Sequence, residues 1–117
     1  MANIEGLTEL QNKLRKLKGI GDNPKALLAG AFVLQKYSQE NAPVGETGFL
    51  KNSISSRENT NGAEVFVGAD YGYYVEMGTS KMAAKPYIRP AIEQHSNEIV
   101  NAVAKVLDGD ISEVGGG

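Results

Sequence analysis

The sequence predicts an α+β fold, in which N-terminal helices and one long C-terminal helix pack against a small antiparallel β-sheet of about three to four strands. Helical spacing of apolar residues towards both ends of the chain predicts the helices. Between them, short segments of alternating apolar and polar residues flank the turn signal Asn61-Gly62, which predicts a β-hairpin.

Length and composition favour a single domain. The chain has 117 residues, of which 41% are apolar and 22% charged, so one modest hydrophobic core is expected. We assign residues 1–107 to one α+β domain. The segment 108–117 is rich in glycine and acidic residues and is expected to form a flexible tail.

Two helices are predicted before the hairpin. The first covers about residues 4–18, because its apolar residues recur every three or four positions, and two glycines then end it. For the second helix, Asn23 is the expected N-cap and Pro24 the first helical residue, and the helix reaches about residue 40. Small residues at 29–31 predict a close crossing with another helix.

The hairpin is predicted from two segments of different clarity. Residues 50–56 alternate as on a half-buried strand, although Leu50 and Ile54 would also share one face of a helix. Residues 64–68 give the clearest strand pattern in the chain. The turn signal Asn61-Gly62 lies between them, so the two strands should pair antiparallel.

The rest of the chain contains one ambiguous element and one clear helix. Residues 71–77 predict either a third strand or a short helical turn, and the aromatic and β-branched residues at 73–75 favour the strand. Pro90 opens the last helix, whose broad apolar face extends to Leu107, and Asp108 begins the segment that ends it.

The segment YGYYVEMGTSKMAAKPYIR, residues 71–89, concentrates the candidate functional residues. It holds four of the five tyrosines of a chain that has no tryptophan and no cysteine. Rings that carry a hydroxyl suit a protein interface, although any one of them could equally fill a small core. Residues 78–85 lack apolar periodicity and predict an exposed loop. We therefore predict an interface made of Tyr71, Tyr73, Tyr74, Glu76, Met77, Gly78, Thr79, Tyr87 and Arg89.

No catalytic, cofactor or metal site is predicted. His95 is the only histidine and lies among polar residues of the last helix, where it is expected to be exposed. Asp108 and Asp110 lack the further oxygen ligands of a calcium loop. Glu76 has no paired acid or base, so it is expected to fix a loop or to bind a backbone or an arginine. Arg89 is the nearest candidate for a bidentate ion pair with the Glu76 carboxylate, within one chain or across a subunit boundary.

The charge balance argues against a protein that works by neutralising phosphates. Twelve basic and fourteen acidic residues leave a net charge of −2. The basic cluster from Lys13 to Lys18 is typical of a solvated helix face, and the alternative hypothesis is a nucleic-acid-binding or DNA-processing accessory protein that uses it. A hydrolase centred on Glu76 and His95 is the least favoured hypothesis.

No stretch approaches the ~20 apolar residues that span a bilayer, and no apolar run of signal-peptide length is present. A soluble protein made in the cytoplasm is therefore expected.

Three sequence blocks stand out when they are taken together. They are Ala42-Pro43 followed by TGFLKNSI at 47–54, YGYYVEMGT at 71–79, and PYIRPA at 86–91. With these blocks the chain resembles the small neck and tail-completion proteins of long-tailed double-stranded-DNA bacteriophages, a head–tail joining family of minor tail and head–tail connector proteins. The resemblance covers about residues 25–107. Each block alone is a weak signal, whereas the trio in this order is fairly specific, and Met77 stands where an aromatic residue is typical of the family.

The resemblance implies a subunit that assembles with copies of itself into a ring, expected to be a hexamer, between the capsid portal and the tail. The implied partners are a head-completion or portal-side protein and a tail terminator or tail tube protein, with no membrane. DNA would pass through the ring without being bound specifically. The protein would be made in the host cytoplasm and located in the neck or tail of the virion, in a head-completion or a tail-completion role. The loop at 78–85 is expected to be mobile in the free subunit and ordered in the ring.

Overall fold

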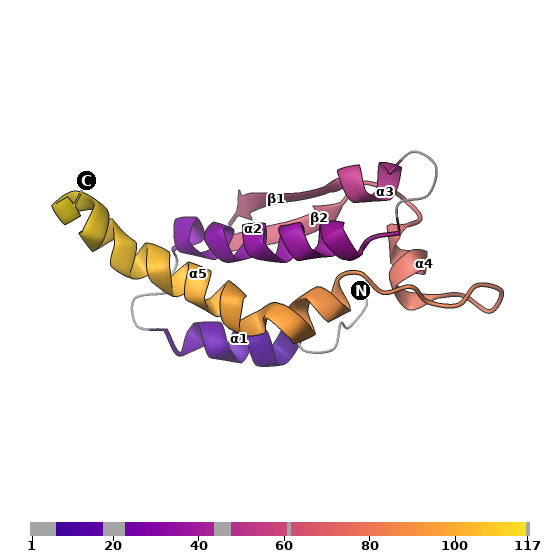
Figure 1. Ribbon diagram of the computed structural model, residues 1–117, viewed down its shortest axis with the longest axis horizontal. Helices are drawn as coiled ribbons and strands as arrows, with labels where there is room; N and C mark the ends of the chain where they lie inside the picture. The colour runs from indigo at the N-terminus through magenta and orange to yellow at the C-terminus, as the bar shows by residue number, and fades with distance from the viewer. Residues whose placement is uncertain (1–6, 18–22, 44–47, 61, 117) are drawn as a thin grey trace.

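The computed structural model describes residues 7–17, 23–43, 48–60 and 62–116 (Figure 1). The α+β class and the long C-terminal helix are confirmed. Predictions that concern the first residues of the first helix, its terminating glycines and Asn61 lie outside the described residues. The elements in chain order are α1 (Leu7–Arg15), α2 (Pro24–Asn41), α3 (Phe49–Asn52), β1 (Ile54–Asn59), β2 (Gly62–Val67), α4 (Gly72–Met77) and α5 (Arg89–Gly116).

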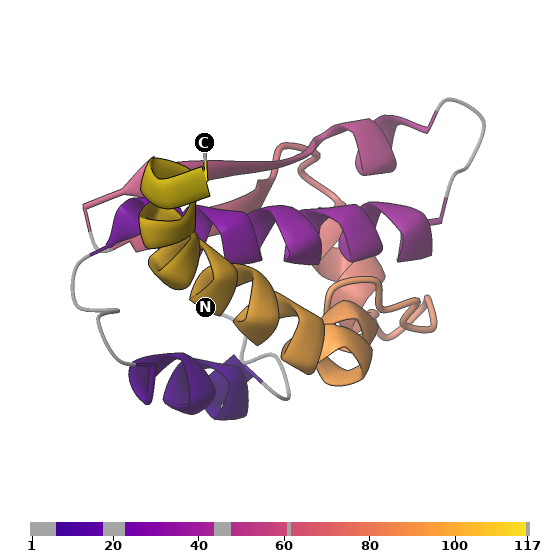
Figure 2. The same ribbon diagram turned by 60° about the vertical axis from the view of Figure 1, so that its left-hand side comes forward.

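Helix α2 is the central element, lying between the hairpin on one side and α5 on the other, while α1 packs on α5 (Figures 1 and 2). The predicted start of α2 is confirmed. The side chain of Asn23 accepts a hydrogen bond from the Ala26 N–H at 3.1 Å, and Pro24 occupies the first helical position.

The close helix crossing predicted from the small residues of α2 is also confirmed. Gly30 is buried against α5, and a Cβ atom placed on it would lie 2.6 Å from Val103 Cγ2 and 3.2 Å from Ile99 Cγ2. Glycine therefore allows the two helices to approach closely, because any larger residue would push α5 away.

The sheet is smaller than predicted. Strands β1 and β2 pair antiparallel, from Ile54 opposite Val67 to Asn59 opposite Gly62, and they are the only two strands in the described ranges. The prediction of three to four strands is therefore wrong. Leu50 lies in α3 rather than in a strand, because the chain turns after it: the Ser53 hydroxyl donates a hydrogen bond to the Leu50 carbonyl at 2.7 Å.

The favoured third strand at 71–77 is also wrong, since Gly72–Met77 forms the helix α4. Its buried residues are Gly72 and Glu76, which are four positions apart and so share one face of a helix. The strand propensity of the aromatic and β-branched residues between them was overridden by the contacts of this buried face.

Among the described residues, two groups of buried apolar side chains share contacts with Ile88. One group joins α3, β1 and the segment before α5, and the other joins α1 to α5. The first group contains Ala42, Leu50, Ile54, Ala69 and Tyr87, and the second contains Leu10, Ile92 and Ile99, with Ile88 packed against both.

Helix α5 bends at His95, whose backbone has φ −125° and ψ 18°. The predicted helix end near Asp108 is wrong, because the helix is assigned as far as Gly116. No proline follows Leu107, so helical hydrogen bonding can continue across Gly109 at a cost of about 1 kcal/mol relative to alanine. That residues 108–117 are flexible stays a prediction. Within the described ranges, no helix combines the length and the apolar character needed to cross a membrane.

Candidate functional site

Large apolar side chains are exposed at one end of the molecule. Among the described residues, seven large hydrophobic side chains are exposed, and six of them belong to α3, α4 and the segments that flank α4, at the right-hand end of Figure 1. The seventh is Phe32, on α2. We call the six side chains the aromatic end: Phe49, Tyr71, Tyr73, Tyr74, Met77 and Met82.

The rings of the aromatic end contact one another at its surface. Tyr73 and Tyr74 meet edge to face, with ring centroids 5.4 Å apart and an interplanar angle of 85°. Phe49 and Tyr71 lie 6.3 Å apart with their rings tilted by 34°. Tilted and edge-to-face pairs are favoured arrangements for aromatic rings. These contacts leave about half of each ring exposed, and 54% of Tyr73 is accessible to solvent.

The opposite side of α4 is buried and holds the start of α5. Glu76 is only 5% exposed, and its carboxylate accepts three backbone hydrogen bonds. Oε1 accepts from the N–H groups of Tyr87 at 2.9 Å and Ile88 at 2.8 Å, and Oε2 accepts from Arg89 at 3.1 Å. The first N–H groups of a helix have no partner within it and carry partial positive charge, so a carboxylate stabilises them.

Within one chain, the predicted pair between the side chains of Glu76 and Arg89 is wrong, while the alternative of a pair across a subunit boundary stays a prediction. Glu76 binds the backbone N–H of Arg89, whereas the Arg89 guanidinium lies 4.0 Å from Glu93. Arg89 is half-buried. The other expectation for Glu76, that it fixes a loop, is confirmed, because it ties α4 to the chain that returns from the loop at 78–85.

Tyr87 belongs to the core rather than to the exposed surface. It is 1% exposed, and its hydroxyl donates a hydrogen bond to the Gly72 carbonyl at 2.9 Å. Burial raises the pKa of Tyr87 to about 12, and the nearby charges of Glu76 and Tyr71 add to this shift. Gly72 fits tightly here, since a Cβ on it would lie 2.6 Å from Val67 Cγ1 and 2.8 Å from the Tyr87 hydroxyl.

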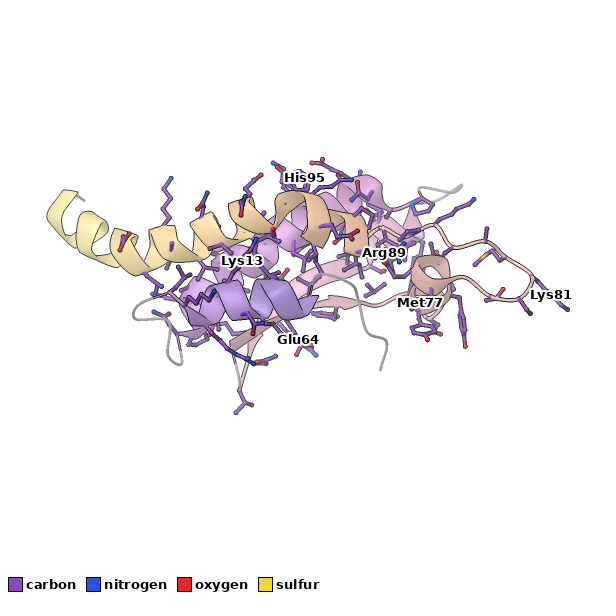
Figure 3. The ribbon with its side chains drawn as sticks, turned by 90° about the horizontal axis from the view of Figure 1, so that it is seen from below. Lys13, Glu64, Met77, Lys81, Arg89 and His95 are labelled. Carbon is purple, nitrogen blue, oxygen red and sulfur yellow. The ribbon has the colours of Figure 1, made fainter. Side chains whose placement is uncertain are left out.

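The loop at 78–85 projects from the body beyond α4, with Lys81 at its tip (Figures 1 and 3). We call it the projecting loop. One hydrogen bond closes its base, from the Lys85 N–H to the Val75 carbonyl at 2.8 Å, while the Gly78 N–H caps the end of α4 by donating to the Tyr74 carbonyl at 2.7 Å. All its side chains from Thr79 onwards are exposed, which confirms the predicted exposed loop. Its mobility in the free subunit stays a prediction.

Thr79 organises the tip of the projecting loop. Its N–H donates to the Met82 carbonyl at 2.8 Å, while its hydroxyl oxygen accepts from the N–H groups of Lys81 at 3.2 Å and Met82 at 3.0 Å. Gly78 has φ +78°, and a Cβ there would lie 2.8 Å from the Ala84 nitrogen. The two ends of the loop therefore approach more closely than any other residue would allow.

The structure divides the predicted interface residues into two sets. Glu76 and Tyr87 are buried, while Gly78 and Arg89 are partly buried. The exposed set is completed by Phe49 and Met82, which the sequence analysis missed. Phe49 follows Gly48 in an early block of the chain, and no sequence signal places it beside Tyr71. The exposed predicted residues are Tyr71, Tyr73, Tyr74, Met77 and Thr79.

His95 lies in a different environment from the one expected. It is half-buried and stacks on Tyr37, with ring centroids 3.5 Å apart and planes inclined by 2°. Its Nδ1 is 3.9 Å from Glu98, to which the Tyr37 hydroxyl donates a hydrogen bond at 2.7 Å that raises the pKa of Tyr37. The contacts of His95 and those of Glu76 involve different residues, so the two do not form an acid–base pair.

The basic cluster predicted from Lys13 to Lys18 is exposed where the structure describes it. Lys13, Arg15 and Lys16 are exposed on and after α1, and Lys13 donates a weak hydrogen bond to Ser96 at 3.4 Å. Lys18 lies outside the described residues. The part of the chain that the structure describes contains no group of three acidic or histidine side chains that could hold a metal ion.

Fold and surface together define a small α+β protein with an exposed aromatic end. A family model described as "Bacteriophage HK97-gp10, putative tail-component" matches residues 8–78, well over half of the chain. The chain therefore belongs to the HK97-gp10-like family and is a component of the phage tail, located in the virion. The match ends at Gly78, so it includes α4. Neither the curated proteins nor the solved structures provide a match to this chain.

Proposed function

We propose that the chain is a structural, non-catalytic subunit of a ring that completes the neck or tail and joins the portal complex of the capsid to the tail. The ring consists of copies of the chain, with a hexamer as the expected size, and DNA passes through it. The observation that carries this proposal is the aromatic end, in a chain that belongs to a family of tail components.

The composition of the aromatic end supports a contact with other proteins. Tyrosine, phenylalanine and methionine are enriched at protein interfaces, and an apolar patch on a soluble protein often marks a binding surface. All six side chains are of these types, and 41% or more of each is exposed. Covering them on assembly would remove apolar surface from water, which favours association.

The rigidity of this end also supports the proposal. Glu76 fixes the inner side of α4 to the start of α5, and the base of the projecting loop is closed by the hydrogen bond from the Lys85 N–H to the Val75 carbonyl. A surface that is already held in place loses less conformational entropy when it binds. The three tyrosines around α4 are thus presented on a fixed support.

The proposed partners follow from a position between head and tail. Neighbouring copies lie within the ring, a head-completion or portal-side protein lies on one side, and a tail terminator or tail tube protein on the other. The aromatic end contacts one of these proteins. The chain is made in the host cytoplasm before it enters the virion.

Complementation of a phage that lacks the gene tests the proposal. Tyr74→Ala removes one ring of the aromatic end, and Phe32→Ala is a matched control, because Phe32 is as exposed as the tyrosines but lies on α2. We expect tail-bearing infectious particles from Phe32→Ala and a loss of at least about tenfold from Tyr74→Ala, as for a residue central to an interface. Equal titres from both variants would contradict the proposed role of the aromatic end.

A further inference from the structure

The hairpin offers two outer strand edges with free hydrogen-bonding groups. The Gly68 N–H donates to the Ser53 carbonyl at 2.9 Å, and this bond fixes which groups of the adjoining ladder point inwards. In an antiparallel ladder hydrogen-bonded pairs alternate with non-bonded pairs, so Ser55 with Phe66 and Arg57 with Glu64 are bonded pairs. The residues between them direct their N–H and C=O groups outwards.

Most of these outward groups have no partner within the described part of the chain. On β1, the side chain of Gln39 donates to the Ile54 carbonyl at 3.2 Å and covers only the first residue. The described residues provide no partner for the outward backbone groups of Ser56 and Glu58 on β1, or of Val65 and Val67 on β2. Such edges are templates for a further strand.

The side chains on the face of the hairpin that carries Arg57 and Glu64 favour pairing of the β1 edge of one copy with the β2 edge of another. Arg57 of β1 lies 3.3 Å from Glu64 and 4.3 Å from the ring centroid of Phe66, both on β2. On this face, β1 therefore carries the cation Arg57, and β2 carries the anion Glu64 and the ring of Phe66. The charge of Glu58 belongs to the other face of β1. Pairing β1 with the β2 of another copy brings opposite charges together, whereas pairing two β2 edges brings two glutamates together.

We propose that β1 of one copy pairs with β2 of the next copy, so that the hairpins form one continuous sheet around the assembly. A contact between two different surfaces of identical chains is heterologous and closes into a ring when its rotation allows. This inference rests on the proposed ring function and names the contact between its subunits. It leaves the aromatic end, at α3 and α4, available to the other proteins of the neck or tail.

A matched pair of substitutions at Glu58 tests this contact. Glu58→Pro removes an outward N–H without removing a bond of the ladder, and proline is tolerated at a strand edge, so the hairpin should remain folded. Glu58→Ala removes the same charge and keeps the N–H. Thermal unfolding checks that both variants are folded, and native mass spectrometry measures assembly of the purified chain and of tails. We expect assembly of the proline variant to be weakened about tenfold or more at each contact, and that of the alanine variant to match wild type within about twofold.

Amide hydrogen exchange provides the second measurement. In the free subunit the outward amides of Glu58 and Val65 should exchange fast and the inward amides of Arg57 and Phe66 slowly, and in the assembly all four should exchange slowly. If wild type is found in the tail as a single copy, the proposed ring is wrong. If several copies are present but Glu58→Pro assembles normally, or the outward amides stay fast, the ring stands and the edge contact is overturned.

Discussion

The two sides of α4 differ in what they do. On the inner side, Gly72 and Glu76 are buried and hold Tyr87 and the first turn of α5. On the outer side, Tyr73, Tyr74 and Met77 are exposed and contribute no side chain to the core. The difference shows that six consecutive residues can carry both a requirement of the fold and a surface for assembly, separated only by the helical period. Substitutions on the inner side should therefore act on stability, and those on the outer side on assembly.

The largest effect is expected at Glu76. Glu76→Ala leaves three backbone N–H groups at the start of α5 without their acceptor and should lower the free energy of unfolding by about 4 kcal/mol. Glu93→Ala is the control, because Glu93 is an exposed acid that only approaches Arg89, and it should cost at most about 0.5 kcal/mol. Urea unfolding of both variants measures the difference, and a Glu76→Ala variant as stable as its control would show that the carboxylate does not hold α5.

A smaller but still clear loss is expected at Gly72. Gly72→Ala places a Cβ within 2.8 Å of the Tyr87 hydroxyl and closer still to Val67, and the strain should cost about 2 to 3 kcal/mol. Gly68→Ala is matched, because its Cβ would meet Ser53 at an ordinary 3.5 Å. Thermal unfolding compares the two, and equal melting temperatures would mean that α4 does not pack as described.

The next smaller effect is the loss of stability that Tyr87 causes at alkaline pH. The pKa of Tyr87 is raised from its ordinary value of 10.0 to about 12 in the folded chain. The stability that comes from keeping the buried hydroxyl neutral is therefore fully present below pH 10. This contribution is lost as the pH rises from about 10 to 12, because the unfolded chain releases the proton first. Tyr87→Phe should cost about 1 kcal/mol at neutral pH through the lost bond to Gly72, and its stability should fall less above pH 10 than that of wild type. Identical alkaline profiles would contradict a buried, hydrogen-bonded Tyr87.

The smallest effect on stability is expected on the outer side. Tyr73→Ala combined with Tyr74→Ala removes two half-exposed rings that contact each other at the surface, so the free energy of unfolding should change by less than about 1 kcal/mol. Chemical denaturation checks this. A loss comparable to that of Glu76→Ala would show that both sides of α4 support the fold.

The sequence predicted the helices better than the sheet. The Asn23 cap and the position of Pro24 at the start of α2 depend on residues that are neighbours in sequence, so they are visible in the pattern. For α4, β-propensity at 73–75 indicated a strand, whereas the decisive contacts come from Val67 and Tyr87, which lie outside the segment. Local propensity could not indicate them.

The sequence indicated the segment that holds most of the exposed aromatic residues, but it did not separate them from the buried ones. The exposed loop and the three tyrosines around α4 follow from composition and are exposed as expected. Tyr87 has the same chemistry as these tyrosines, and only its place in the core distinguishes it. Likewise, a backbone partner was one of the expectations for Glu76, but the sequence could not indicate which N–H groups it binds, because every residue except proline has one.

The most direct test of the account is the amount of protein incorporated into phage tails. The variant that combines Tyr73→Ala and Tyr74→Ala would be compared with Phe32→Ala, with both expressed in cells infected by a phage that lacks the gene and the tails purified by sedimentation. We expect both variants to melt like wild type and only Phe32→Ala to be found in the tails. Incorporation of the double variant at the level of Phe32→Ala would contradict the claim that the outer side of α4 serves assembly.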